Sequence, residues 1–186
     1  YVQIAGPVAT KDTKAMYEEM FDLGCSLILI DGAIDRKSIA SPETSDAVIL
    51  STGAVVSRKL SKVVEETAHV VGLYTSKVME DGEARALIEN NKDRERVMLV
   101  DKTDGKYSIR IIDEMTSGLG NSLKIDEEIR EDTEFVYIPG AFTDSVVMNI
   151  SPKKARQVEF ILKDPTRVFF DSTKWGQMVK QVFSIK

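Results

Sequence analysis

Short apolar runs alternate with polar segments in the first part of this chain. Residues 27–30 read Leu-Ile-Leu-Ile and are bounded by Gly24 and Gly32, which predicts a strand buried on both faces. Residues 2–5 and 47–50 predict two further strands of the same kind. Because a helical pattern lies between the runs at 2–5 and 27–30, we expect a parallel pair with a right-handed crossover, within a three-layer parallel sheet.

Two segments of the first 80 residues have helical periodicity. Apolar residues recur after Asp12, which can cap the helix start, and the pattern ends at Gly24. Residues 57–73 predict a second helix, whose apolar stripe comprises Leu60, Val63, Val64, Thr67, Ala68 and Val71. Glu65 and His69 lie four residues apart outside this stripe, a spacing at which two side chains meet on a helix surface. Without further His or Cys ligands, this pair is no signature of a metal site.

The character of the chain changes at residues 80–83, which read Glu-Asp-Gly-Glu. We therefore expect a parallel α/β lobe over 1–80 and a smaller mixed α/β lobe over 81–186. In the second lobe, strands at 96–101 and 107–112 flank an Asp-Gly turn, which predicts a hairpin. The other elements expected there are a helix at 83–88, a turn at 117–121, an acidic helical turn at 126–131, strands at 135–138, 158–162 and 168–170, a helix at 144–150 capped by Thr143, and a closing helix after Asp171.

The composition excludes some classes of function. The chain has 186 residues, a net charge of −5 and no basic stripe, which argues against a nucleic-acid-binding protein. No apolar run approaches the roughly 20 residues that cross a bilayer. Cys25 is the single cysteine, so no internal disulfide forms, which fits a reducing, cytoplasmic location. Because the sequence opens at Tyr1, inside an expected strand, we expect a fragment of a longer protein.

Polar residues follow the strand predicted at 27–30. In open α/β sheets, ligands bind beyond the carboxyl ends of the strands. We expect a nucleotide or partner-binding loop here, with Arg36 and Lys37 meeting phosphate or an acidic partner, and Asp31 binding a magnesium-bound water or backbone amides. The candidate residues are Asp31, Gly32, Asp35, Arg36, Lys37, Ser38 and Ser41, joined by Thr52 and Gly53 after the strand predicted at 47–50. A solvated crossover and an ordinary strand-to-helix turn explain the same residues equally simply.

Two runs resemble a known family. One is residues 29–42, Leu-Ile-Asp-Gly-Ala-Ile-Asp-Arg-Lys-Ser-Ile-Ala-Ser-Pro, with Thr52-Gly53-Ala54 and residues 64–67; the other is residues 138–144 with 158–170. Together they resemble the small subunit of the lysine 5,6-aminomutase reactivase and its clostridial-type relatives. The resemblance implies an accessory factor for a cobalamin-dependent aminomutase. It also implies ATP, a divalent ion such as magnesium, and a larger ATPase subunit similar to the MutS proteins. It assigns no catalytic residue, cofactor or resident metal to this chain.

Two other readings remain open. The first lobe also resembles part of the P-loop NTPase fold that includes dethiobiotin synthetase. The G-x-x-x-x-G-K-[ST] phosphate loop of that group is not in the sequence, so an ATP-dependent enzyme of this kind requires the loop to lie upstream of Tyr1. The second reading is a structural interaction module, in which the polar loop is a docking surface.

Overall fold

The computed structural model describes residues 1–6, 10–31, 40–92, 95–112 and 118–175. These residues form two compact units, Tyr1–Ser51 and Thr52–Lys186. This division falls after Ser51, whereas the sequence predicts a domain boundary near residue 81. Whether residues 81–186 fold independently stays a prediction.

In its described residues, the first unit contains one α-helix, α1, which covers Thr10–Asp22. The helix expected here is confirmed, but Asp12 lies in its first turn and is not its N-cap. Its end matches the glycine signal, because Gly24 has φ +95°. The Gly24 N–H donates to the Phe21 carbonyl (2.9 Å) and the Cys25 N–H to the Met20 carbonyl (3.0 Å), which is a Schellman motif.

The strands expected at 2–5, 27–30 and 47–50 are wrong, because none of these segments forms a β-ladder. Leu27, Leu29 and Ile49 are 73%, 77% and 89% exposed instead of buried. An apolar run shows that a segment avoids water, but a strand also needs a partner whose position the run does not specify. In the described part of residues 1–80, the secondary structure is helical, and the expected parallel-sheet lobe is not present there.

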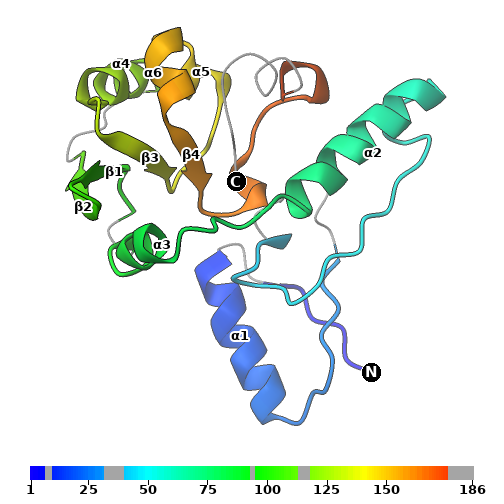
Figure 1. The fold of residues 1–186 in the computed structure, drawn as a ribbon. Helices are drawn as coiled ribbons and strands as arrows, with labels where there is room; N and C mark the ends of the chain where they lie inside the picture. The colour runs from blue at the N-terminus through cyan, green and yellow to red at the C-terminus, as the bar shows by residue number, and fades with distance from the viewer. Residues whose placement is uncertain (7–9, 32–39, 93–94, 113–117, 176–186) are drawn as a thin grey trace. The chain divides into compact units, whose positions relative to one another are not determined.

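The second unit is built on a four-stranded mixed sheet in the order β2-β1-β3-β4 (Figure 1). The strands are β1 (Met98–Thr103), β2 (Lys106–Ile111), β3 (Thr133–Ile138) and β4 (Glu159–Leu162). β1 is antiparallel to β2 and β3, whereas β3 and β4 are parallel. The predicted hairpin is confirmed: φ is +52° at Asp104 and +79° at Gly105, as a type I′ turn requires.

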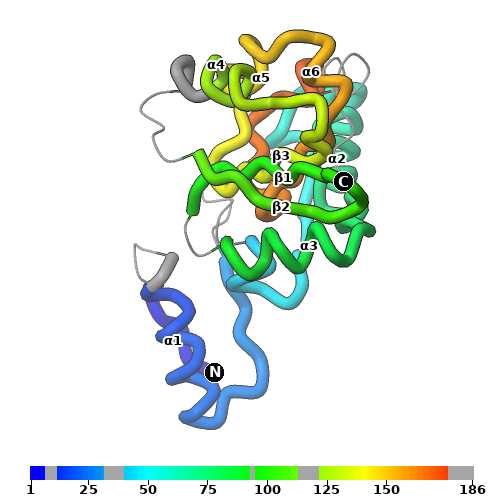
Figure 2. Tube along the Cα trace, turned by 60° about the vertical axis from the view of Figure 1, so that its left-hand side comes forward, coloured from blue at the N-terminus to red at the C-terminus, as the bar shows by residue number. Residues whose placement is uncertain are grey.

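Helices cover both faces of this sheet (Figures 1 and 2). One face packs on α4 (Gly118–Glu128), α5 (Asp144–Val147) and α6 (Pro152–Gln157), and on Leu73 of α2 (Leu60–Tyr74). The other face packs on α3 (Gly82–Glu89) through Ala84 and Ile88. The side chains of β1 alternate between the two cores: Leu99 belongs to the first, and Met98 and Val100 to the second. The mixed α/β character expected for the second lobe is therefore confirmed.

Several expected elements of the second unit have different bounds. The turn expected at 117–121 is wrong where the structure describes it, because α4 begins at Gly118, and the acidic turn expected at 126–131 is helical only to Glu128. The helix expected at 144–150 ends at Val147, and Thr143 precedes it without a capping hydrogen bond from its side chain. The strand expected at 168–170 is reduced to one bridge between Val168 and Phe142, after the short 3-10 helix η3 (Pro165–Arg167).

A β-bulge between β1 and β3 positions the polar residues described next. Val100 pairs with Phe135, but Asp101 pairs with Thr133, which leaves Glu134 as an extra residue. An extra residue reverses the alternation of side chains on the bulged strand. Thr133 therefore meets Asp101 on the α4 side of the sheet, whereas Glu134 meets Lys102 and Tyr107 on the other side.

Candidate functional site

The predicted binding loop is only partly within the described residues. Gly32, Asp35, Arg36, Lys37 and Ser38 lie outside them. Asp31 is exposed and lies in no regular element.

Ser41 is 4% exposed, and its hydroxyl accepts a hydrogen bond from the Glu43 N–H (3.3 Å). Ser41 thus stabilises a local turn, and a role of the loop in binding stays a prediction.

Thr52 and Gly53 lie beside the middle of α2. The Thr67 hydroxyl donates to the Val63 carbonyl (2.6 Å), so the Thr52 hydroxyl is the donor in its contact with the Thr67 hydroxyl (2.7 Å). Gly53 accepts from the Val56 N–H (3.0 Å) in a tight turn. The structure therefore connects Thr52 to a face of α2. Thr52 belongs to the second unit, and Asp31 and Ser41 belong to the first.

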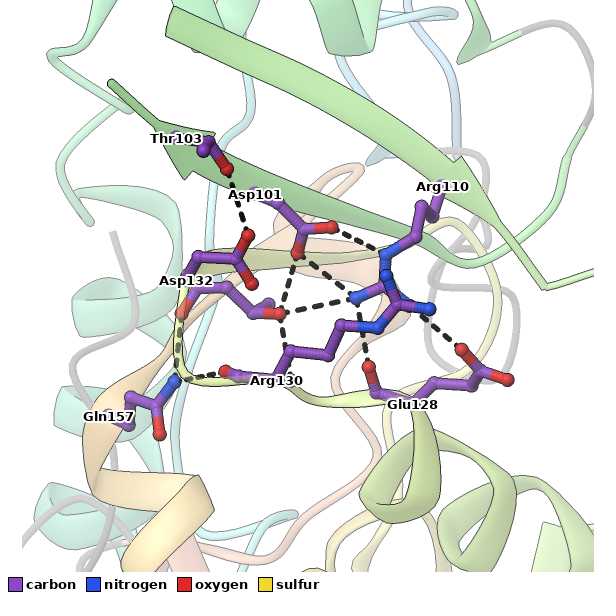
Figure 3. Close-up of polar contacts among 8 residues, drawn as sticks. Asp101, Thr103, Arg110, Glu128, Arg130, Asp132 and Gln157 are labelled. Atoms are coloured by element: carbon purple, nitrogen blue, oxygen red, sulfur yellow. Dashed lines mark hydrogen bonds and ion pairs between the residues drawn. The ribbon is translucent and has the colours of Figure 1, made fainter. Parts of the chain in front are cut away.

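The densest polar network in the described residues surrounds Asp101, whose side chain is 5% exposed (Figure 3). Arg110 on β2 donates to both carboxylate oxygens, through Nε to Oδ2 (2.5 Å) and through Nη2 to Oδ1 (3.0 Å). The Thr133 hydroxyl donates to Oδ1 at 2.6 Å. Burial alone would raise the pKa of Asp101, but the hydrogen bonds from Arg110 and Thr133 outweigh this effect and hold that pKa below its usual value. Asp101 therefore stays ionised in the folded state.

The same network ties the end of α4 to the sheet. Arg110 Nη1 donates to the Glu128 carboxylate (2.8 Å), and Arg110 Nη2 to the Glu128 backbone carbonyl (2.9 Å). A cation is favourable at this position because the carboxyl end of a helix carries partial negative charge. The Arg130 N–H donates to the Thr133 hydroxyl (3.0 Å), and the Gln157 amide donates to the Arg130 carbonyl.

The contacts of this network indicate a structural role. Both oxygens of Asp101 are occupied, and the guanidinium of Arg110 is bound to two carboxylates and one carbonyl. Asp101 also lies near the end of β1 that adjoins the start of β3, whereas ligands of open α/β sheets bind at the carboxyl ends of parallel strands. We conclude that the network holds α4 and three strands together.

A second polar cluster lies on the α3 side of the sheet. Burial raises the pKa of Tyr107 to about 12, so the phenol keeps its proton and can donate to either neighbouring carboxylate. These are Asp81 Oδ2 (2.7 Å) and Glu134 Oε2 (2.9 Å), and Lys102 Nζ donates to the phenolic oxygen at 2.9 Å. Asp81 also accepts from the Glu83 and Ala84 N–H groups and so caps α3. The cluster attaches the start of α3 to the sheet.

A third cluster joins α2 to the segment after η3. The Ser172 hydroxyl lies 2.8 Å from Glu65 Oε1 and 2.9 Å from Glu66 Oε1, and it accepts from Lys62 Nζ (3.2 Å). A hydrogen bond with Glu66 raises the pKa of Lys62, so its amine stays protonated and cannot act as a general base for Ser172. Ser172 therefore links α2 to the segment after η3.

His69 also faces this segment. Its Nε2 lies 3.2 Å from the Phe170 carbonyl, and its ring lies 5.8 Å from that of Trp175. Glu65 is exposed, as expected for a residue on the helix surface, and contacts Ser172, whereas His69 is half-buried against Phe170. Within the described ranges, no group of three or more His, Cys, Asp or Glu side chains is placed to hold a metal ion.

These inward contacts leave the apolar stripe of α2 exposed. At about 100° per residue, Leu60, Val64 and Val71 lie within about 40° of arc, and Lys62, His69 and Leu73 lie on the opposite side. Leu60, Val64 and Val71 are 78%, 59% and 46% exposed. Val55, in the turn after Thr52, is 96% exposed. We call Leu60, Val64 and Val71 the α2 apolar surface.

The sequence predicted the stripe but placed it on the buried side of the helix. The outcome differs because Leu73 joins the first core, and Lys62 and Glu66 contact Ser172 in the segment after η3. The signal for the polar networks was partly available, since the predicted hairpin brings Asp101 and Arg110 onto the same face of neighbouring strands. Nothing in the sequence indicated the bulge that brings Thr133 to them.

The chain matches no family model, no curated protein and no solved structure with which it was compared. Among the helices in the described ranges, none is both long enough and apolar enough to cross a membrane.

Proposed function

We propose that this chain is an accessory subunit that acts by binding another protein through the α2 apolar surface. The observation that carries the proposal is the orientation of α2: the side that carries Lys62 and Leu73 contacts the rest of the second unit, and Leu60, Val64 and Val71 on the opposite side are exposed. Exposed apolar patches on folded proteins mark interaction sites. The three polar clusters support the same interpretation, because their charged groups form hydrogen bonds and ion pairs with one another.

The resemblance carried by residues 29–42, 52–54, 64–67, 138–144 and 158–170 gives this proposal a specific form. In that form, the chain is the small subunit of a reactivating factor for a cobalamin-dependent aminomutase, located in the cytoplasm. Its direct partner is the larger, MutS-like ATPase subunit, which supplies ATP hydrolysis.

The alternative is an ATP-dependent enzyme with a P-loop NTPase fold. It requires strands at 27–30 and 47–50 that present Asp31 and Thr52 to a nucleotide at one sheet edge. Because these segments form no ladder and Thr52 is bonded to Thr67, we favour the accessory subunit. A purely structural interaction module shares the α2 apolar surface and differs only in lacking the aminomutase system.

The test is capture of the larger ATPase subunit by this chain. We expect the double substitution Val64→Asp and Val71→Asp to weaken capture at least tenfold, about 1.4 kcal/mol, because two charges would be buried at the interface. Ser61→Asp is the matched control: it adds a charge to the same helix, outside the α2 apolar surface, and should leave capture unchanged. Equal capture by all variants would refute the proposal, and capture of an unrelated protein by the same surface would restrict it to an interaction module.

A further inference from the structure

Among the described residues, the outer edge of β2 has no backbone partner. β2 is the first strand in the order β2-β1-β3-β4, so it has a neighbour on one side only. Two hydrogen bonds set the phase of its ladder: the Ile112 N–H donates to the Val97 carbonyl (3.0 Å), and the Lys102 N–H turns away from β2 to the Asp132 carbonyl (2.8 Å). Residues of an antiparallel pair alternate between bonded and non-bonded positions. Tyr107, Ile109 and Ile111 therefore direct their N–H and C=O groups outward.

This edge lacks the usual protection against pairing. Natural edge strands carry proline, a bulge or an outward-directed charge. β2 contains no proline, and its register with β1 is continuous. Arg110 is held inward by Asp101 and Glu128, and Lys106 lies at the end next to the turn. Figures 1 and 2 show α3 covering a face of the sheet and leaving the edge of β2 without a covering helix.

We propose that a second copy of this chain pairs with β2 in an antiparallel, two-fold symmetric arrangement centred on Ile109. Ile109 then pairs with the partner subunit's Ile109, and Tyr107 with the partner subunit's Ile111. Each of these pairs exchanges two backbone hydrogen bonds. The result is a continuous eight-stranded sheet across the two subunits, a surface distinct from the α2 apolar surface.

Charge selects this register over its neighbours. A centre at Ser108 places Lys106 opposite the partner subunit's Arg110, and a centre at Arg110 places two arginines opposite each other. Like charges directly opposite each other on neighbouring strands destabilise the pairing. With the centre at Ile109, Ser108 lies opposite the partner subunit's Arg110, and Lys106 lies opposite the partner subunit's Ile112. The apolar character of the Tyr–Ile and Ile–Ile pairs favours a second copy over a charged peptide.

Hydrogen exchange of the backbone amides tests the pairing in the unmodified protein. We expect the amides of Tyr107, Ile109 and Ile111 to become at least tenfold more protected as the protein concentration is raised from micromolar to near-millimolar. The amides of Ser108 and Arg110 are bonded to β1 and should be protected at every concentration. Outward amides that exchange at the same rate at both ends of this range would overturn the proposal.

Sedimentation of two matched variants tests the register. Ser108→Lys places a second cation opposite Arg110 of the partner subunit and should produce a monomer. Ser108→Gln adds a neutral side chain of comparable length and should sediment as a dimer, like the unmodified chain. Ser108 is exposed, so both variants keep the β1–β2 hairpin. A monomeric unmodified chain, or identical sedimentation of the two variants, contradicts the proposed pairing.

Discussion

At the scale of single residues, Asp101 shows how a buried charge is tolerated. Removing a carboxylate from water is costly, and the cost is offset only when its oxygens are fully hydrogen-bonded. Arg110 supplies charge and two of these bonds, and Thr133 supplies a third. The hydroxyl of Thr133 is itself held by the Arg130 N–H, so its direction is set by the backbone between the end of α4 and the start of β3.

We expect Thr133→Val to destabilise the protein by about 1–3 kcal/mol, because it leaves one oxygen of a buried carboxylate short of a donor. Thr103→Val is the matched control, since the Thr103 hydroxyl donates to Asp132 (2.9 Å) at an exposed position. Its effect should stay within about 0.5 kcal/mol. Urea unfolding at neutral pH measures both free energies, and equal losses for the two variants would contradict a special role of Thr133.

Acid provides a second readout of the same variant. The folded-state pKa of Asp101 is depressed, so the stability from its hydrogen bonds is present above the unfolded-state pKa of about 3.9 and is lost as the pH falls through the folded-state pKa. The Thr133→Val penalty should therefore shrink below about pH 4. A penalty that is constant between pH 7 and pH 2.5 would point to lost packing instead.

At the scale of elements, the β1–β2 hairpin depends on two residues with positive φ. The type I′ turn matches the right-handed twist of the flanking strands, and Gly105 adopts φ +79° at little cost. The hairpin in turn places Asp101 and Arg110 on one face, and Lys102 and Tyr107 on the other. Both polar networks of the sheet thus depend on this turn.

We expect Gly105→Ala to destabilise the protein by about 1–2 kcal/mol, because a Cβ atom is unfavourable at positive φ. Gly72→Ala is the opposite control: Gly72 lies inside α2, and a Cβ there meets no atom within 4 Å. Alanine should stabilise that helix by about 0.5–1 kcal/mol. Chemical denaturation of both variants gives the two free energies, and a shift of the same sign in both would contradict this account.

The orientation of α2 is also decided at the level of the element and its neighbours. The apolar stripe predicts a helix, and α2 forms there. Which side of α2 is buried depends on Leu73, which joins the first core, and on His69 and Lys62, whose partners lie 101 and 110 residues later in the chain. No local rule includes contacts of that separation.

At the scale of the whole molecule, both hydrophobic cores lie in the second unit. Their buried residues extend from Leu73 to Phe170. Leu73 belongs to the first core and Met79 to the second. The unit therefore holds its cores without residues 1–51.

We expect the fragment 52–186 to fold with a circular dichroism spectrum like that of the complete chain and to unfold cooperatively. The fragment 81–186 follows the boundary expected from the sequence and lacks Leu73 and Met79, so it should be less stable by at least about 2 kcal/mol. Thermal and urea unfolding of the two fragments and the complete chain compares them. Equal stability of both fragments would favour the boundary near residue 81.

Local chemistry was sufficient for the features that depend on neighbours in sequence. The glycine end of α1, the Asp-Gly hairpin and the strand at β3 follow from backbone preferences and short spacing. The tertiary structure decided the exposure of 27–30 and 47–50, the bulge at Glu134 and the outward face of α2. Each of these depends on which distant segment lies beside it, and that choice is made by packing and charge pairing of the whole fold.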